Sequence, residues 1–401
     1  MLNMKEQALE LHFRNKGKLE VKSKISVKNK QDLSLAYSPG VAEPCKEIYS
    51  LENKAYDYTM KGNTVAVISN GTAVLGLGNI GALASLPVLE GKAMLFKEFA
   101  NVDAFPVCIN TTDIQQFVNC VKLLEPTFGA INLEDIAAPH CFTIEEELKK
   151  GLKIPVFHDD QHGTAIVVMA GLINSLKITN KEIDKIKVVV NGAGAAGVSI
   201  VRMLHQYGVQ NIIMCDSNGA IYDGRIIGMN GIKEEIAKIS NIQREKGNLS
   251  NVIGNADVFI GVSVAGALTK EMIRTMSRDP IVFALANPTP EIMPEYAKEA
   301  GARVVATGRS DYPNQINNVL AFPAIFRGAL DVYATQINEE MKIAAVSAIA
   351  ELIKEDELSE EYIIPCPFDP RVVEVVSNSV SEAAVRTGVS QKNGMIKNSY
   401  A

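Results

Sequence analysis

Two pairs of adjacent acidic residues each follow a short apolar run in the middle of the chain. Glu134 and Asp135 stand in INLEDI, and Asp159 and Asp160 stand in VFHDDQHG. Neighbouring residues of a strand point to opposite faces, so adjacent acids converge only beyond the end of a strand. Converging carboxylates repel one another unless a cation neutralises them, and an all-oxygen ligand set suits Mg²⁺ or Mn²⁺ rather than Zn²⁺. The pattern predicts a divalent metal site, with ordinary loop acids as the alternative interpretation.

Lys92 lies on the apolar side of a helix predicted over Val88–Phe99. At 100° per residue it falls between Leu89 and Phe96, whereas Glu90 lies on the opposite side. Burial removes hydration from an ammonium group and lowers its pKa, so we expect Lys92 to act as a base near neutral pH. The alternative is a lysine that extends along the helix to reach water.

A G-x-G-x-x-G fingerprint stands between an apolar run, KVVV, and a helical pattern, VSIVRMLHQYG. The next apolar run, NIIMC, ends at Asp216, 24 residues after the first glycine of the fingerprint. The glycines let the backbone approach a pyrophosphate, the helix N-terminus offers unpaired N–H groups, and the carboxylate binds ribose hydroxyls. We therefore predict a dinucleotide site that contains Gly192, Ala193, Gly194, Ala195, Ala196, Gly197 and Asp216.

The choice between NAD and NADP depends on the residues at and after Asp216. A carboxylate repels the 2′-phosphate of NADP, so Asp216 favours NAD. Ser217 and Asn218 follow, however, and Arg225 is close enough in the sequence to bind a phosphate. We expect NAD and leave NADP open.

A second G-x-G-x-x-G occurs at Gly76, Gly78 and Gly81. Pro87 follows the last glycine by six residues and should interrupt the helix whose N-terminus would face a phosphate. We predict that this copy forms a tight turn of the substrate-binding domain instead.

Four further polar residues stand beside turns or after strand-like runs. Tyr37 precedes Ser38-Pro39-Gly40, a turn that fixes its ring at a loop edge, and Asn287 stands in FALANPTPE. Asn317 and Asn318 close SDYPNQINN. Uncharged amides at such places can hold a carboxylate or a carboxamide without competing for a metal. The alternative is that the tyrosine packs and the asparagines form turns.

The elements that must position these residues alternate between β-rich runs and helical patterns. Strands are predicted at residues 64–69, 104–109, 130–133, 155–157, 187–190, 211–215, 258–261, 281–284 and 303–306, and a buried helix at 164–177. Such alternation is typical of parallel sheets with helices on both faces. We predict an α/β fold with an N-terminal α/β substrate and metal domain over residues 1–155. A Rossmann-type doubly wound parallel-sheet domain with extra C-terminal helices should occupy residues 156–401.

The composition is that of a globular protein with a small-molecule partner. Hydrophobic residues make up 47% of the 401 residues, and 40 Lys and Arg against 46 Asp and Glu leave a net charge of −6, which argues against nucleic-acid or membrane binding. The longest apolar stretch, residues 164–176, is too short to cross a bilayer. The first residues resemble neither a secretion signal nor a transit peptide, and the six cysteines form no C-x-x-C pair. We expect a cytoplasmic protein with reduced thiols.

Eight segments, taken in order, resemble the malic enzymes in their short microbial form without an appended domain. They are AYSPGVAEPC, NGTAVLGLGNIG, LEGKAMLFK, INLEDI, VFHDDQHGTA, NGAGAAG, FALANP and QINN, and the resemblance extends over about residues 16–385. It implies oxidative decarboxylation of L-malate to pyruvate and carbon dioxide with NAD(P)⁺ and Mg²⁺ or Mn²⁺, and activity on oxaloacetate. It also implies a homodimer or a larger homo-oligomer.

The resemblance further implies roles for the acidic residues and the lysine. Glu134, Asp135 and Asp160 match the three metal ligands of the family. Lys92 matches the base that takes the proton of the malate hydroxyl, with Asp159 in its hydrogen-bond network. Gly192, Ala193, Gly194, Ala195, Ala196, Gly197, Asp216 and Asn287 match the cofactor site.

The remaining matches concern the substrate. Tyr37 matches the acid that protonates the enol, and it could enter the site of a neighbouring subunit. Asn287 and Asn318 match substrate-binding amides. The large eukaryotic members have an arginine that grips a substrate carboxylate where this chain has Ala73, so the carboxylate clamp is unassigned.

Two other functions stay open at this point. One is a metal-dependent oxaloacetate decarboxylase with little redox activity, and the other is a dinucleotide-sensing binding protein. The joint presence of Tyr37, Lys92, Asp159 and the acidic cluster argues against a sensor, because a sensor needs no acid, base and metal set.

Overall fold

Four short strands form the first sheet of the computed structural model, which describes residues 3–392. In spatial order they are β2 (Asp103–Cys108), β1 (Thr64–Ser69), β3 (Ala130–Leu133) and β4 (Val156–His158). All neighbouring pairs run parallel. A parallel sheet is covered on both faces, and β1 and β3 are accordingly buried at every position. The carboxyl ends of these strands meet at one edge.

Three helices connect and cover this sheet: α5 (Ala82–Ala100), α6 (Ile114–Leu123) and α7 (His140–Gly151). The prediction that Pro87 interrupts the first of them is wrong, because α5 passes through Pro87 without ending. A proline deprives one carbonyl of its helical partner. The buried side chains Leu89 and Phe96 of the same helix more than offset that loss.

The second sheet has six strands and follows the doubly wound plan predicted from the sequence. In spatial order they are β10 (Val304–Thr307), β9 (Ile281–Ala284), β8 (Val258–Gly261), β5 (Lys187–Asn191), β6 (Asn211–Asp216) and β7 (Gly219–Ala220). Only β7, which was not predicted, pairs antiparallel, and two residues are too few to leave a sequence pattern. From β5 the strand order continues to one side through β6 and to the other side through β8. Ligands of such sheets bind at this switch point.

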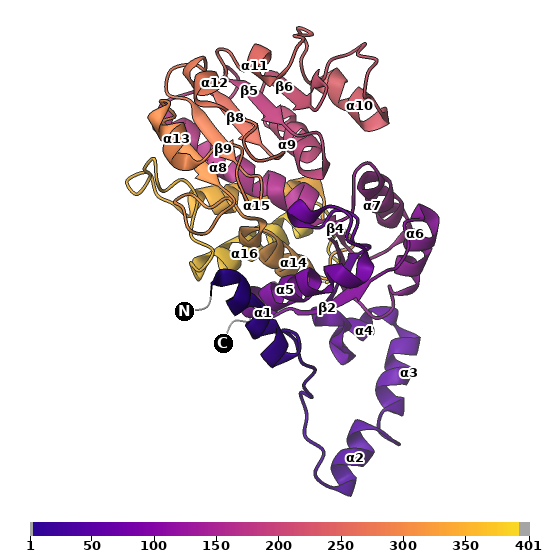
Figure 1. Cartoon of the computed structure of the whole chain (residues 1–401). Helices are drawn as coiled ribbons and strands as arrows, with labels where there is room; N and C mark the ends of the chain where they lie inside the picture. The colour runs from indigo at the N-terminus through magenta and orange to yellow at the C-terminus, as the bar shows by residue number, and fades with distance from the viewer. Residues whose placement is uncertain (1–2, 393–401) are drawn as a thin grey trace.

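Six helices belong to this second part of the chain, and Figure 1 shows them on both sides of its sheet. They are α8 (Thr164–Thr179), α9 (Ala195–Gln206), α10 (Gly231–Ile239), α11 (Leu249–Val252), α12 (Lys270–Arg274) and α13 (Pro294–Glu299). The buried helix predicted at residues 164–177 corresponds to α8. Within residues 3–392, none of the helices combines the length and the apolarity that a membrane crossing needs.

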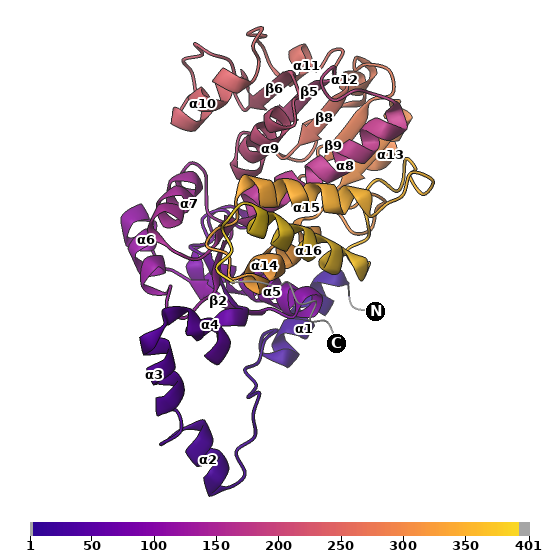
Figure 2. The ribbon, with the colours of Figure 1, turned by 180° about the vertical axis from the view of Figure 1, so that it is seen from behind.

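Three C-terminal helices lie between the two sheets in both views of the molecule (Figures 1 and 2). They are α14 (Phe322–Asp331), α15 (Glu339–Glu351) and α16 (Arg371–Arg386). α14 packs against α5 of the first sheet, and α15 packs against α8. One continuous apolar cluster therefore extends from the first sheet to the second, and the last part of the chain holds the two halves together.

Four N-terminal helices precede the first sheet, and none of them has a buried residue. They are α1 (Met4–Asn15), α2 (Lys30–Ala36), α3 (Ala42–Ser50) and α4 (Ala55–Tyr58). Figures 1 and 2 show α2 and α3 projecting away from the rest of the chain. We call residues 30–50 the N-terminal arm.

Five short helical turns complete the described chain: η1 (Glu52–Lys54), η2 (Met60–Asn63), η3 (Leu75–Leu77), η4 (Asp159–Gly163) and η5 (Asn318–Leu320). The turn η4 is a π-helix that lies between β4 and α8. The domain boundary expected at residue 155 stays a prediction. Strand β4, which pairs with β3, extends the first sheet to His158.

Candidate active site

Three carboxylates converge at the carboxyl edge of the first sheet. Glu134 and Asp135 directly follow β3, and Asp160 lies in η4 directly after β4, the neighbouring strand. One oxygen from each of the three side chains lies within 4.8 Å of the others. The backbone N–H of Asp135 also donates a hydrogen bond of 2.8 Å to Asp160 Oδ2. The three candidate ligands that the sequence placed after two separate strands are thus brought together.

The charges of this cluster favour a bound cation. Burial raises the pKa of Glu134 to about 7, an effect that Lys92 opposes and Asp160 reinforces. Burial likewise raises the pKa of Asp160 to about 6, opposed by Lys92 and reinforced by Asp159. A divalent cation would stabilise the ionised form of these carboxylates, whose pKa values are raised. An all-oxygen ligand set fits Mg²⁺ or Mn²⁺.

Lys92 reaches this cluster from α5. Its Nζ lies 2.5 Å from Asp159 Oδ2, 3.0 Å from Glu134 Oε1 and 4.2 Å from the centroid of the Phe322 ring. Its side chain is buried, in accordance with the apolar helix face on which the sequence placed it. The expected fall in its pKa is wrong for this arrangement. Burial lowers the pKa of Lys92, but the carboxylates of Asp159 and Glu134 raise it by more.

Asp159 lies on the opposite side of η4 from solvent and is fully buried. Burial raises its pKa to about 7 against the opposing effect of Lys92. The turn closes tightly around this side chain, because a Cβ atom on Gly163 would lie 1.9 Å from Asp159 Oδ1. The same Cβ would lie 3.2 Å from the Cβ of Asn318, so η5 packs against the turn as well. Sequence reasoning does not single out Gly163, although a glycine three residues after an acidic pair is a usable signal.

Asn287 follows β9 and lies against two glycines from different parts of the chain. A Cβ on Gly76 would lie 2.8 Å from the backbone oxygen of Asn287, and one on Gly308 would lie 2.9 Å from its Nδ2. Gly76 lies in η3, the turn that follows β1 of the first sheet, so Asn287 lies where the two halves of the chain meet. Ala73 lies next to the carboxylate cluster, since its N–H donates to the backbone oxygen of Asp135 at 3.0 Å.

The glycine-rich turn between β5 and α9 has the form that a dinucleotide needs. Gly192 has φ of 121°, and a Cβ there would lie 2.4 Å from the backbone oxygen of Val262. A Cβ on Gly197 would lie 1.8 Å from the backbone oxygen of Gly192, which requires a glycine where the helix packs on the strand. Gly194 is different, because no described atom lies within 4 Å of its Cβ position. The helix begins there without a side-chain cap, which leaves room and N–H groups for a pyrophosphate.

Asp216 ends β6 and is held by two cations. Arg225 contacts both of its carboxylate oxygens, and Lys233 Nζ lies 2.6 Å from Oδ2. Burial raises the pKa of Asp216, but these two partners lower it more, to about 2. Arg225 was expected near the cofactor from the sequence, whereas Lys233 was missed because it lies on the following helix, α10.

Tyr37 is placed apart from the other candidate residues. It follows α2 in the N-terminal arm, and its side chain is 68% exposed. The arm projects away from the body of the molecule in both views (Figures 1 and 2). Within one copy of the chain, therefore, the structure does not bring Tyr37 to the Lys92 cluster.

The chain is similar to known proteins along most of its length. Residues 16–149 match the family model described as malic enzyme, N-terminal domain, and residues 161–387 match that described as malic enzyme, NAD binding domain. The bifunctional malic/malolactic enzyme of Bacillus subtilis is 67% identical over 390 residues, which are 97% of this chain and 95% of that protein.

Further relatives agree with these matches. The NAD-dependent malic enzyme of Geobacillus stearothermophilus is 56% identical over all of this chain and 83% of its own length. The crystal structure of malic enzyme from Pyrococcus horikoshii has a TM-score of 0.93 at 48% identity, covering 98% of this chain and 93% of that one. Proteins named for NAD and proteins named for NADP are both among the relatives.

Proposed function

The chain belongs to the malic enzyme family, and from that premise we propose how its residues oxidatively decarboxylate L-malate to pyruvate and carbon dioxide. The family, the α/β fold and the class of NAD(P)-dependent oxidoreductase predicted from the sequence are confirmed. The proposed residue roles rest on one observation. Lys92 and Asp159 lie together with three carboxylates at one edge of the first sheet.

Glu134, Asp135 and Asp160 are the residues that would hold the cation. When bound, the cation acidifies the malate hydroxyl and stabilises the charge that develops as carbon dioxide leaves, while the nicotinamide accepts the hydride. Glu134 and Asp135 are buried, which strengthens the charge interactions within the site, and the side chain of Asp160 is partly exposed.

Lys92 and Asp159 form the proton-transfer pair of the proposed site. Their 2.5 Å hydrogen bond lets a proton pass between Nζ and Oδ2 without a change of geometry. The other oxygen, Asp159 Oδ1, is buried and has no hydrogen-bond partner among the described residues. It can therefore accept a further hydrogen bond. Lys92 can serve as the base only when the carboxylate charges that raise its pKa are offset, which a divalent cation on the cluster would do.

Asn287 and Asn318 are proposed to orient the substrate. Both belong to the second half of the chain, and Asn318 packs against η4, the turn that carries Asp159 and Asp160. Their amide groups can bind a carboxylate without adding charge to the cluster. The position of Ala73 offers no charged group, so the residue that clamps the second carboxylate stays unassigned.

We infer that Tyr37 acts in a neighbouring subunit of a homodimer. The N-terminal arm exposes Leu35, Tyr37 and Tyr49, whose side chains are 68–94% exposed, with Leu35 at 70%. An exposed apolar arm that carries a catalytic acid far from its own site is explained if the arm packs on a second copy of the chain. A cytoplasmic location, expected from the sequence, stays part of the proposal.

A second candidate function is suggested by a relative. The Bacillus subtilis protein at 67% identity is named a bifunctional malic/malolactic enzyme. We propose that this chain also converts malate to lactate, with the hydride returned to pyruvate so that NAD is not consumed. Carbon dioxide is released in both reactions, and only the fate of the hydride differs.

The test is to incubate the purified protein with L-malate and Mn²⁺, with NAD⁺ and NADP⁺ in separate reactions, and to assay NADH or NADPH, pyruvate and lactate. Oxidative decarboxylation predicts pyruvate equimolar with the reduced cofactor. Lactate in excess of the reduced cofactor would identify the malolactic reaction. No product from malate, together with pyruvate from oxaloacetate, would instead favour a plain decarboxylase.

A further inference from the structure

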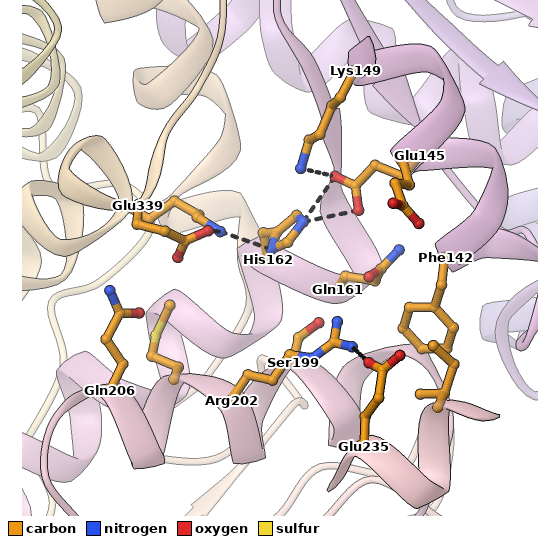
Figure 3. Close-up of a pocket in the computed structure, with 14 residues that line it drawn as sticks. Phe142, Glu145, Lys149, Gln161, His162, Ser199, Arg202, Gln206, Glu235 and Glu339 are labelled. Atoms are coloured by element: carbon orange, nitrogen blue, oxygen red, sulfur yellow. Dashed lines mark hydrogen bonds and ion pairs between the residues drawn. The ribbon is translucent and has the colours of Figure 1, made fainter. Parts of the chain in front are cut away.

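Glu145, in the middle of α7, is a buried acid that the proposed mechanism does not use. Its side chain is 7% exposed and borders a cavity of about 550 Å³ between α7, η4, α9 and α15. Figure 3 shows Glu145 on one wall of this cavity, with dashed lines to Lys149 and His162. A buried carboxylate without a catalytic task needs a structural or a positioning explanation.

One carboxylate contacts both ends of the turn that carries two site residues. Glu145 Oε1 accepts a hydrogen bond of 3.3 Å from the backbone N–H of His158, which precedes Asp159. Both oxygens of Glu145 contact His162 Nε2, at 2.8 Å and 3.0 Å. Asp159 and Asp160 lie between these two histidines, so Glu145 fixes the segment from outside the metal cluster.

The ring of His162 has a polar partner at each of its two nitrogens. Glu145 is ionised, because His162 and Lys149 lower its pKa by more than burial raises it, and an ionised carboxylate only accepts hydrogen bonds. Nε2 of His162 therefore carries the proton and donates to Glu145. On the other side of the ring, Lys342 Nζ lies 3.3 Å from Nδ1. The ring is held on both sides and cannot rotate without breaking one of the two contacts.

These contacts continue into the helices that join the two halves of the chain. Lys342 belongs to α15, is buried, and forms an ion pair of 2.5 Å with Glu339 of the same helix. The contacts therefore run from α7 of the first sheet through η4 to α15. A π-helical turn is rare, and the contacts of Glu145 with His158 and His162 hold this one from outside.

We propose that Glu145 is a positioning residue that holds η4 in the shape in which Asp160 faces Glu134 and Asp135. This inference rests on the proposed function, because it requires that the three carboxylates bind the cation. Glu145 acts through η4 and does not itself contact the substrate, the metal or the cofactor. Groups that orient metal ligands in this way commonly contribute tenfold to hundredfold to metal affinity.

The test is the dissociation constant of Mn²⁺ alone, measured by electron paramagnetic resonance on the full-length, metal-stripped protein at pH 8. We expect E145A to weaken Mn²⁺ binding by roughly tenfold to hundredfold. The control is E146A, since Glu146 is the next residue of α7, borders the same cavity, and pairs only with Lys150 among the described residues at an exposed position. E146A should bind Mn²⁺ within about twofold of the parent.

Two further variants keep the test decisive. If E145A does not fold, E145L replaces it, because leucine fills part of the same buried volume but offers no acceptor to the N–H of His158 or to Nε2 of His162. A folded E145A or E145L protein, judged by circular dichroism, that binds Mn²⁺ as tightly as the parent would overturn the proposal. A purely structural role would lower the melting temperature and leave this constant unchanged.

D160N separates a failure of this inference from a failure of the proposed function. Asp160 is a proposed ligand, so D160N should lose Mn²⁺ binding whatever Glu145 does. If D160N binds Mn²⁺ like the parent, the metal is not at this cluster, and both the proposed metal site and the role of Glu145 fall. If D160N loses the metal and the Glu145 variants do not, only the role of Glu145 falls.

Discussion

Lys92 Nζ lies 2.5 Å from Asp159 Oδ2, although the two residues come from a helix and a turn that are 67 residues apart. Neither residue is exposed, and Glu134 approaches the same ammonium group at 3.0 Å. This buried contact connects the proton-transfer pair directly to the proposed metal ligands. The protonation of Lys92 and the charge at the cluster are therefore coupled.

Replacing Lys92 should therefore abolish catalysis without removing the metal. We expect K92M to lower kcat by roughly 10²- to 10⁴-fold, because the base is lost. Mn²⁺ should bind as tightly as in the parent or more tightly, since a positive charge beside the ligands is gone. K97M, on the exposed side of the same helix, is the control and should keep its activity. A K92M protein with more than a tenth of the parent kcat would exclude Lys92 as the base.

The acidic cluster predicts how stability responds to pH and metal. Glu134 and Asp160 have pKa values raised by burial to about 7 and about 6. Such carboxyl groups stabilise the fold below their unfolded pKa values near 4, and the contribution is lost as pH rises through the folded values. Metal binding needs the ionised groups, so Mn²⁺ should raise the melting temperature more at pH 8 than at pH 5. Equal increases at both pH values would contradict this account.

The tight turn around Asp159 predicts that one methyl group on Gly163 is damaging. G163A places a Cβ 1.9 Å from Asp159 Oδ1, so the carboxylate must move. We expect kcat/KM to fall by about 100-fold or more. G91A, next to Lys92 in α5, is the control, because no described atom lies within 4 Å of its Cβ position and alanine favours helix. The idea fails if G163A and G91A have similar activities.

The ion pairs of Asp216 predict a route to a changed cofactor preference. D216N removes the carboxylate that occupies Arg225 and Lys233 and leaves two cations free for a 2′-phosphate. We expect the ratio of kcat/KM for NADP to that for NAD to rise by about tenfold or more. D223N is the control, since Asp223 pairs with Arg244 at an exposed position. If the NADP-to-NAD ratio of kcat/KM is unchanged in D216N, the 2′-position of the cofactor does not lie at Asp216.

The proposed exchange of Tyr37 between subunits is testable with mixed variants. Y37F and K92M should each be inactive when prepared alone. A hybrid dimer of the two has one site with an intact Lys92 and an intact Tyr37 from the neighbour. Mixing with subunit exchange should then restore up to about a quarter of the parent activity. If Tyr37 serves its own chain, the mixture stays inactive.

The sequence predicted the parts of this fold that depend on local pattern. The parallel strands are continuous apolar runs, and both acidic pairs immediately follow such runs, so their convergence at one edge could be anticipated. The prediction at Pro87 is wrong because the burial of Leu89 and Phe96 stabilises the helix by more than one proline destabilises it. That burial depends on helices more than 200 residues away in the chain.

The remaining misses share this long-range origin. The pKa of Lys92 was expected to fall because its helix face suggests burial, but no local pattern reveals that Asp159 and Glu134 meet the ammonium group. Lys233 joins Asp216 across 17 residues, and Glu145 reaches His162 from a different helix. The sequence indicates which residues are buried, whereas the partners they meet depend on the packing of distant elements.

The most direct test of the central claim is a crystal of the protein grown with Mn²⁺ and examined by anomalous diffraction. The account predicts a peak bounded by one carboxylate oxygen from each of Glu134, Asp135 and Asp160, and no such peak in crystals of D160N. A Mn²⁺ peak elsewhere in a crystal of active enzyme, with none at this cluster, would contradict the assignment of the metal and the mechanism that depends on it.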